Sequence, residues 1–439
     1  MNIIYVHTHD TGRYIQPYGY GIPTPNLQAM AEEGTLFRQA FCAAPTCSPS
    51  RAALLTGMAP HTNGMLGLAH RGFGLYDYSQ HLARVLKDQG YETALSGVQH
   101  EGSWREIQGQ LGYEYNLTDR EAKGFKDCDL ANAEHAADYI RTPKDKPFFL
   151  SFGMGNTHRD FLDLDEETNP NYVQPPLPMY DNAANREDMA KYISSIKVVD
   201  ICVGKVLDAV KEAGIEDETV IFFTTDHGIA FPKMKCNLYD SGIGISLIFK
   251  YPGNPSKGDA VDAIVSQIDV LPTLCELVGV DTPDAVQGKS LVPLLNKETD
   301  EINEEIFSEV TYHAAYEPQR CIRTERYKLI KYYEEPKPVM ANIDGGPSKS
   351  FLMEHDYMNQ RWEPEMLFDL YMDPTERINV KDDPAYQDVY QQLNHRLAKW
   401  MTDTKDPLCQ GGRVPKPEGA RINTRDCLDP ASKDPKDFE

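Results

Sequence analysis

The chain has 439 residues, of which 41% are hydrophobic and 25% are charged, and its formal net charge is −23. This length exceeds that of one small core, so we expect a large α/β domain and a smaller second domain. The acidic balance argues against nucleic acid as a partner, because nucleic-acid-binding proteins need a basic surface. The sequence contains no apolar run long enough to span a bilayer, so we expect no membrane partner.

Nine cysteines are scattered along the chain, and none of them forms a CxxC pair. This spacing indicates neither a zinc ribbon nor a disulfide framework. The first residues, MNIIYVHTHD, lack the basic and apolar segments of a signal peptide. We therefore expect reduced thiols and a cytoplasmic protein, whose oligomeric state the sequence leaves open.

Apolar runs and helical spacing alternate through the first half of the chain. In chain order, we predict a strand at 2–6, helices at 26–33 and 79–89, strands at 92–97 and 147–153, a helix at 185–213 and a strand within 217–228. Strands that alternate with helices are typical of a mostly parallel sheet covered on both faces. The predicted fold class is therefore α/β.

The last third of the chain changes character. Short charged strands are predicted at 304–313, 319–335 and 365–371, and a closing helix at 385–401. We therefore divide the chain into a catalytic domain, 1–302, and a smaller α+β subdomain with an antiparallel sheet, 303–439. Residues 403–439 are rich in Pro, Gly, Asp and Lys, and we expect them to wrap the surface or to extend from it.

Polar clusters follow four of the predicted strands. They read HTHD (7–10), GVQH (97–100), GNTHRD (155–160) and TTDHG (224–228). Ligands of open α/β sheets bind beyond the carboxyl ends of the strands. The sequence therefore predicts that these four clusters form one site.

A helix is predicted in CSPSRAALLTG (47–57), with Pro49 in its first turn and Gly57 at its end. Cys47 then lies just before a helix N-terminus, where free N–H groups and the macrodipole favour an anion. Arg51 follows one turn later and can reach the same anion. A buried structural cysteine and a thiolate nucleophile both remain open interpretations of Cys47.

The same stretch matches the signature C-x-P-S-R-x-x-x-L-T-G of the sulfatase family at every fixed position, and the chain resembles that family. Within the family it is most similar to the heparan N-sulfatase (sulfamidase) branch. Five further stretches carry the likeness: 61–68, 226–239, 309–313, 367–379 and 397–407. The resemblance implies an alkaline-phosphatase-like fold and a sulfuric ester hydrolase, with sulfamidase activity as one form. It also implies that a maturation enzyme converts Cys47 to formylglycine.

The resemblance implies one divalent metal, held by His9, Asp10, Asp226, His227 and the modified Cys47. The family places two adjacent aspartates first, so Asp10 matches and His9 departs. Oxygen ligands favour calcium. Two imidazoles in the set also suit manganese or zinc. His9 alone is equally consistent with a residue that only lines the pocket.

The family motif G-K-x-H reads G-V-Q-H here, so His100 is kept and Val98 replaces a lysine that normally neutralises sulfate. We expect Gln99 or another group to compensate. His158 matches the histidine that serves the leaving group, and Lys235 matches the basic residue after the second metal motif. The resemblance makes both of them, with His100, catalytic candidates.

The family mechanism, transferred to these positions, begins with attack of hydrated formylglycine on sulfur, with Asp226 as base. Arg51 and Lys235 stabilise the sulfate oxygens. His158 protonates the leaving alcohol or amine, and His100 assists the expulsion of sulfate.

The substrate implied by the resemblance is a sugar that carries an N- or O-sulfate. We expect the polar and aromatic stretch 340–362 to rim its pocket, with Lys349 as an exposed substrate-binding candidate beside Lys235; a solvated loop is the alternative. The charge of −23 repels long polyanions, which favours a small saccharide. Two other functions stay open: a phosphate or phosphonate ester hydrolase of the same superfamily, and a non-catalytic binding protein on this scaffold.

Overall fold

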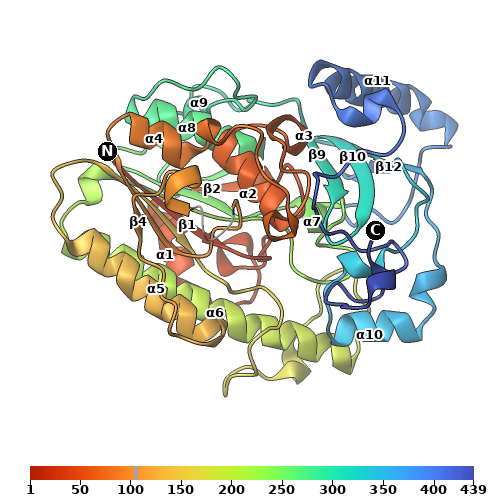
Figure 1. Cartoon of the computed structure of the whole chain (residues 1–439), viewed down its shortest axis with the longest axis horizontal. Coiled ribbons are helices and arrows are strands. Elements are labelled where there is room, and N and C mark those ends of the chain that lie inside the picture. Colours follow the sequence, from red (N-terminus) through yellow and green to blue (C-terminus); the bar gives the residue numbers. More distant parts are fainter. Residues whose placement is uncertain (103–106) are drawn as a thin grey trace.

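The computed structural model describes residues 1–102 and 107–439, and Figure 1 shows two sheets side by side. The larger sheet has eight strands in the order β4-β3-β5-β1-β6-β7-β2-β8. Strand β7 runs antiparallel to both of its neighbours, and the other pairings are parallel. The predicted mostly parallel α/β sheet is therefore confirmed.

The predicted strands of the first half correspond to β1, β3, β5 and β6, whereas β2, β4, β7 and β8 were not predicted. The bounds are β1 (Asn2–Thr8), β2 (Thr35–Phe41), β3 (Glu92–Gly97), β4 (Tyr115–Asn116), β5 (Phe148–Gly153), β6 (Thr219–Thr225), β7 (Leu247–Lys250) and β8 (Ala260–Ser266).

Helices cover both faces of this sheet (Figure 1). One face carries α1 (Pro25–Glu33), α5 (Gly124–Arg141) and α6 (Ala183–Glu212). The other carries α2 (Cys47–Thr56), α4 (Leu82–Asp88), α8 (Val270–Val278) and α9 (Val292–Leu295). Alternate strand residues enter the two cores, as Tyr5 and Val6 do. Because both faces are buried, the central strands read as continuous apolar runs.

The smaller sheet is antiparallel, in the order β12-β11-β10-β9. Its strands are β9 (Glu305–Tyr312), β10 (Tyr316–Thr324), β11 (Tyr327–Tyr332) and β12 (Glu365–Asp369). The closing helix α11 (Gln387–Asp403) buries Leu393, Leu397 and Met401 against it. Both predictions for this region, the antiparallel sheet and the closing helix, are confirmed.

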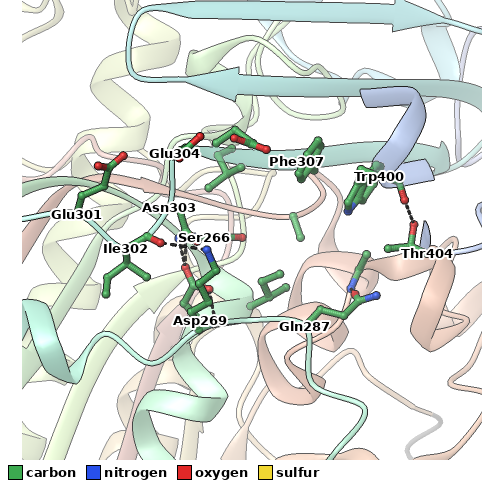
Figure 2. A pocket seen from close by; sticks show the side chains of 16 residues that line it. Ser266, Asp269, Gln287, Glu301, Ile302, Asn303, Glu304, Phe307, Trp400 and Thr404 are labelled. Carbon is green, nitrogen blue, oxygen red and sulfur yellow. Dashed lines mark hydrogen bonds between the residues drawn. The ribbon is translucent and has the colours of Figure 1, made fainter. Parts of the chain in front are cut away.

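The two sheets meet near residue 303, where we divided the chain. Asn303 Nδ2 donates a hydrogen bond to Asp269 Oδ2 at 2.9 Å, across the predicted division (Figure 2). Trp400 of α11 stacks on Phe307 of β9 with ring centroids 4.6 Å apart. A cavity of about 520 Å³ lies along this seam. Because the two parts are in contact along this boundary, the division into domains 1–302 and 303–439 stays a prediction.

Residues 403–439 wrap the surface, which is one of the two predicted arrangements. Ile422 is fully buried, and Asn423 forms bridges to Ala315 and to Phe438. All nine cysteines are free thiols. Within the ranges 1–102 and 107–439, no helix is both long and apolar enough to cross a membrane.

Candidate active site

The four predicted polar clusters meet at one edge of the larger sheet. They follow β3, β5, β1 and β6, which are consecutive in the sheet and parallel to one another. The carboxyl ends of these strands therefore lie together, as the sequence predicted. Helix α2 begins beside them, because Cys47 Sγ lies 3.6 Å from His227 Nε2.

Cys47 is the first residue of α2, one position further into the helix than predicted. Thr46 is the extended N-cap residue, and Gly57 ends the helix with a φ of 66°. Cys47 is 2% exposed. Burial raises the pKa of its thiol, and the charge of Lys235 only partly opposes this effect. The cysteine therefore remains a thiol near neutral pH, which argues against a simple thiolate nucleophile.

The predicted metal-binding residues converge on one point. The ligand atoms of His9, Asp10, Cys47 and Asp226 all lie within 4.8 Å of one another. His227 Nε2 lies 3.3 Å from Asp10 Oδ1. The buried atom Asp10 Oδ1 has no hydrogen-bond donor within the described residues. An oxygen left without a donor between imidazoles and a second carboxylate fits a divalent cation.

Neighbouring groups orient His227 and keep Asp226 ionised. His227 Nδ1 bonds to the Gly228 carbonyl oxygen at 2.9 Å, which leaves the Nε2 lone pair facing Asp10 and Cys47. Burial alone would raise the pKa of Asp226, but the charges of His227, Arg51 and His9 hold this pKa well below its usual range. Asp226 is thus an anion near neutral pH, which suits metal ligation, and its role as a base stays a prediction.

Arg51 braces Asp226. Its Nη2 donates to Asp226 Oδ2 at 3.0 Å and to the Thr8 carbonyl oxygen at 2.7 Å, and its Nη1 contacts His7 Nδ1. Arg51 is only 1% exposed. The guanidinium therefore orders a carboxylate of the site, and its direct contact with a bound anion stays a prediction.

Lys235 connects three parts of the site. Its Nζ donates to Asp10 Oδ2 at 2.9 Å and lies 2.8 Å from Asp344 Oδ2. It also lies 3.4 Å from His158 Nε2. Burial would lower the pKa of Lys235, but Asp10 and Asp344 raise it well above the usual range. Lys235 is therefore a cation near neutral pH, and it faces His158.

Further imidazoles lie beside the His9 ring. The His100 ring lies 4.6 Å from that of His9 and 6.4 Å from that of His70. His158 lies 5.5 Å from His9. Burial lowers the pKa of His100 to about 3, and the charge of Arg51 adds to this effect. His100 is thus neutral near pH 7, and its buried Nδ1 has no hydrogen-bond partner among the described residues.

Two predicted substrate-binding residues are engaged in their own segments. Gln99 is buried, and its side chain bonds to the backbone of Glu101 and Gly102. The ammonium of Lys349, predicted to be exposed, is buried and donates to three carbonyl oxygens, those of Met340, Ile343 and Leu428. The expectation of exposure is wrong because 347–354 forms a helix, α10 (Pro347–Glu354), docked against the protein. Substrate binding by either side chain stays a prediction.

Asp344 is the site residue that sequence reasoning missed. It lies in the predicted rim stretch 340–362, so the segment was identified correctly and the residue was not. Burial would raise the pKa of Asp344, but Lys235 lowers it below its usual range. Asp344 brings a carboxylate to the site from the segment between β11 and β12, and only the folded structure shows this placement.

The fold and the site define the class as an α/β enzyme in which a helix begins at Cys47, beside a cluster of residues that could hold a metal ion. Residues 1–280 match the family model described as Sulfatase, which covers more than half of the chain. Residues 228–344 match the model described as N-sulphoglucosamine sulphohydrolase, C-terminal. The chain belongs to the sulfatase family, near its sulfamidase-like branch. Sulfatases hydrolyse sulfuric esters, and the family implies a metal and a formylglycine.

Curated relatives match over most of their length. N-sulphoglucosamine sulphohydrolase of Homo sapiens is 28% identical, over 88% of this chain and 86% of that protein. Delta 4,5-hexuronate-2-O-sulfatase of Bacteroides thetaiotaomicron is 26% identical, over 91% and 88%. These alignments extend through both sheets of the structure.

Solved structures share the fold. A 2-O GAG sulfatase superposes with a TM-score of 0.73 at 21% identity, covering 99% of this chain and 98% of that chain. The phosphonate monoester hydrolase of Agrobacterium radiobacter gives a TM-score of 0.71 at 19% identity, covering 92% and 96%. The alkaline-phosphatase-like fold is thereby confirmed, and the second likeness concerns the fold alone.

Proposed function

We propose that this protein hydrolyses a sulfate ester or sulfamate on a small sugar, with a formylglycine made from Cys47 as nucleophile. The observation that carries the proposal is the convergence on Cys47 of two carboxylates and two imidazoles at the carboxyl ends of the central strands. This convergence fits the signature around Cys47 and the family to which the chain belongs.

The proposed reaction needs two components besides the encoded side chains: a bound divalent cation and the modification of Cys47. A divalent cation, for which we propose calcium, would be held by His9, Asp10, Asp226 and His227, and would bring positive charge to the sulfate oxygens. A maturation enzyme would supply the oxygen nucleophile by converting Cys47. Manganese and zinc are the alternatives that the imidazoles favour.

The chain's own residues perform the remaining tasks. Arg51 fixes Asp226, and His227 is held in one tautomer by the Gly228 carbonyl oxygen. His158 bonds to the Arg159 carbonyl oxygen through Nδ1 and presents Nε2 to the Lys235 ammonium. A proton at this Lys235–His158 pair is available to the leaving oxygen or nitrogen, a contribution of about 10²–10⁴-fold in rate.

We propose a sulfated amino sugar or uronate as substrate. The relatives named for N-sulphoglucosamine and for hexuronate-2-O-sulfate support both. The site is deep, because Cys47, Asp226 and Lys235 are each at most 3% exposed. Such depth suits the terminal sugar of a short saccharide. The net charge of −23 opposes the approach of a long polyanion.

The test is sulfate release from matured protein, measured by ion chromatography. Glucosamine N-sulfate, glucosamine 6-sulfate and an unsaturated 2-sulfated uronate form the panel, and Cys47→Ala is the inactive control. We expect release from at least one sulfated sugar. Release from none of them would refute the proposal.

A phosphate or phosphonate ester hydrolase is the second candidate. The observations in its favour are the imidazole of His9 within 3.1 Å of Asp226 Oδ2 and the absence of the family lysine at Val98. Matched phosphate esters of the same sugars decide between the two functions. Turnover of phosphate esters with no release of sulfate would establish this second function.

A further inference from the structure

A second cavity, of about 750 Å³, lies between the segment 177–181, the segment 233–241 and the smaller sheet. No residue that we assign to the reaction centre lines it. The two sites share one segment: Lys235 reaches Asp10 and Asp344, whereas Lys233, two residues earlier, lines this cavity. This volume is in the range of small-ligand sites, about 300–1,000 Å³.

Two cations line this cavity without a carboxylate partner. Lys233 and Arg377 have no acidic group within ion-pair distance in the described part of the chain, and Lys233 lies over the Tyr357 ring at 5.7 Å. Burial lowers the pKa of Lys233, and the positive charge of Arg377 lowers it further, so the two cations repel each other.

The carboxylates of the cavity are already neutralised. Asp181 is paired with Arg186 at 2.6 Å, and Glu376 is paired with the buried Lys328 at 2.7 Å. The cavity is therefore locally cationic in a protein of net charge −23. A bound anion would stabilise two cations that repel each other. The cavity therefore complements an anionic ligand, although the protein as a whole is acidic.

The rest of the wall is aromatic and apolar. Tyr239, Trp362, Met366 and Phe368 line it. Trp362 is held by stacking on Tyr332, with centroids 6.1 Å apart, and Tyr239 contacts Phe368 at 6.0 Å. Asn237 adds a polar group. A sugar ring has apolar C–H faces and polar edges, so a rigid aromatic wall beside two cations matches a sugar that carries an acidic group.

We propose that this cavity is an accessory binding site for an anionic saccharide, with Lys233 and Arg377 binding its sulfate or carboxylate groups and Trp362 supporting a sugar ring. The site goes beyond the proposed hydrolysis, because binding there needs neither a formylglycine nor turnover. The competing occupant is a second copy of this chain, since Leu177 and Tyr180 at the cavity are 58% and 69% exposed.

The test uses the full chain as Cys47→Ala, which prevents turnover. The probes are a sulfated heparin tetrasaccharide and the same tetrasaccharide after chemical desulfation, titrated by calorimetry. Lys233→Gln/Arg377→Gln is compared with Arg120→Gln/Lys433→Gln, which removes two exposed cations elsewhere. Because Arg377 is exposed, Arg377→Gln alone provides a variant with little risk to folding. A second readout is the tryptophan emission change on binding, in the parent and in Trp362→Phe.

We expect the sulfated probe to bind about tenfold or more weakly to the Lys233/Arg377 variant, as two lost charged contacts imply. The control pair should bind it as the parent does, and Trp362→Phe should lose the emission change. Unchanged affinity of the Lys233/Arg377 variant for the sulfated probe overturns the proposal, whereas an equal loss for the desulfated probe supports it and assigns the two cations to the carboxylates of the saccharide. A dimer that this variant dissociates while saccharide binding stays intact also overturns the proposal. Selective loss of binding in this test supports the accessory site even if matured protein with Cys47 intact releases no sulfate from the sugar panel, a result that would refute only the proposed function.

Discussion

Glu317→Gln removes a buried charge and keeps a hydrogen-bond acceptor. Glu317 lies on β10 and is 6% exposed. Its Oε2 accepts a hydrogen bond from Asn342 Nδ2 at 2.8 Å, and Asn342 lies two residues before Asp344 in the chain. Burial raises the pKa of Glu317 to about 7, and the bond from Asn342 only partly opposes this. Glutamine can accept the same bond without a charge.

The direction of the pH effect follows from proton binding. The ordinary pKa of a glutamate is 4.5, so unfolded Glu317 loses its proton near that pH, whereas folded Glu317 keeps it up to about pH 7. The folded state binds more protons in this window, and wild-type stability therefore falls as the pH rises through it. A shift from 4.5 to about 7 corresponds to about 3 kcal/mol, of which roughly 2.5 kcal/mol falls between pH 5 and pH 8.

Urea unfolding at pH 5 and pH 8 measures the effect. Relative to wild type, Glu317→Gln should gain about 2.5 kcal/mol in unfolding free energy between the two pH values. Glu354→Gln, which removes an exposed carboxylate on α10, should follow the wild type. An equal difference between Glu317→Gln and wild type at both pH values would refute the assignment of a buried, proton-binding Glu317.

Three further changes test other parts of the structure. Asp344→Asn removes one of the two carboxylates that raise the pKa of Lys235. We therefore expect kcat to fall about tenfold or more and the alkaline limb of the pH–rate profile to move to lower pH. Asp356→Asn, at an exposed turn, should change neither quantity. Asp10→Asn should abolish the metal that we expect at one ion per chain in inductively coupled plasma analysis, and metal retained at full stoichiometry would contradict the ligand set. Phe222→Ala should lower the unfolding free energy by about 3–5 kcal/mol, because its ring is fully buried between Tyr5 and Phe249, whereas Tyr172→Ala, at 90% exposure, should stay within about 0.5 kcal/mol of wild type.

The sequence predicted correctly that the four polar clusters meet, because the patterns that place them are local. Each polar cluster directly follows a strand whose apolar run is readable, and parallel strands bring their carboxyl ends together. Cys47 could be placed at a helix start from Pro49 and Gly57 alone. The resemblance then supplied the roles that local patterns leave open.

The features that the sequence did not predict depend on tertiary contacts. Strand β2 reads TLFRQAF, and β8 alternates exposed and half-buried residues over its first half, so neither shows a continuous apolar run. The prediction of an exposed Lys349 is wrong, because three carbonyl oxygens accept hydrogen bonds from its ammonium in the folded chain. Asp344 reaches Lys235 only because the smaller sheet docks beside the larger one, a placement that no local pattern encodes.

The central claim is that Cys47 becomes formylglycine, and mass spectrometry of one peptide tests it most directly. Trypsin releases residues 39–51, which contain both Cys42 and Cys47. After expression with a maturation enzyme and alkylation, this peptide should carry one alkylated cysteine, at 42, and should show a loss of about 18 Da at position 47 in the fragment series. Alkylation of both cysteines in every preparation would contradict the account, because the site would then lack its nucleophile.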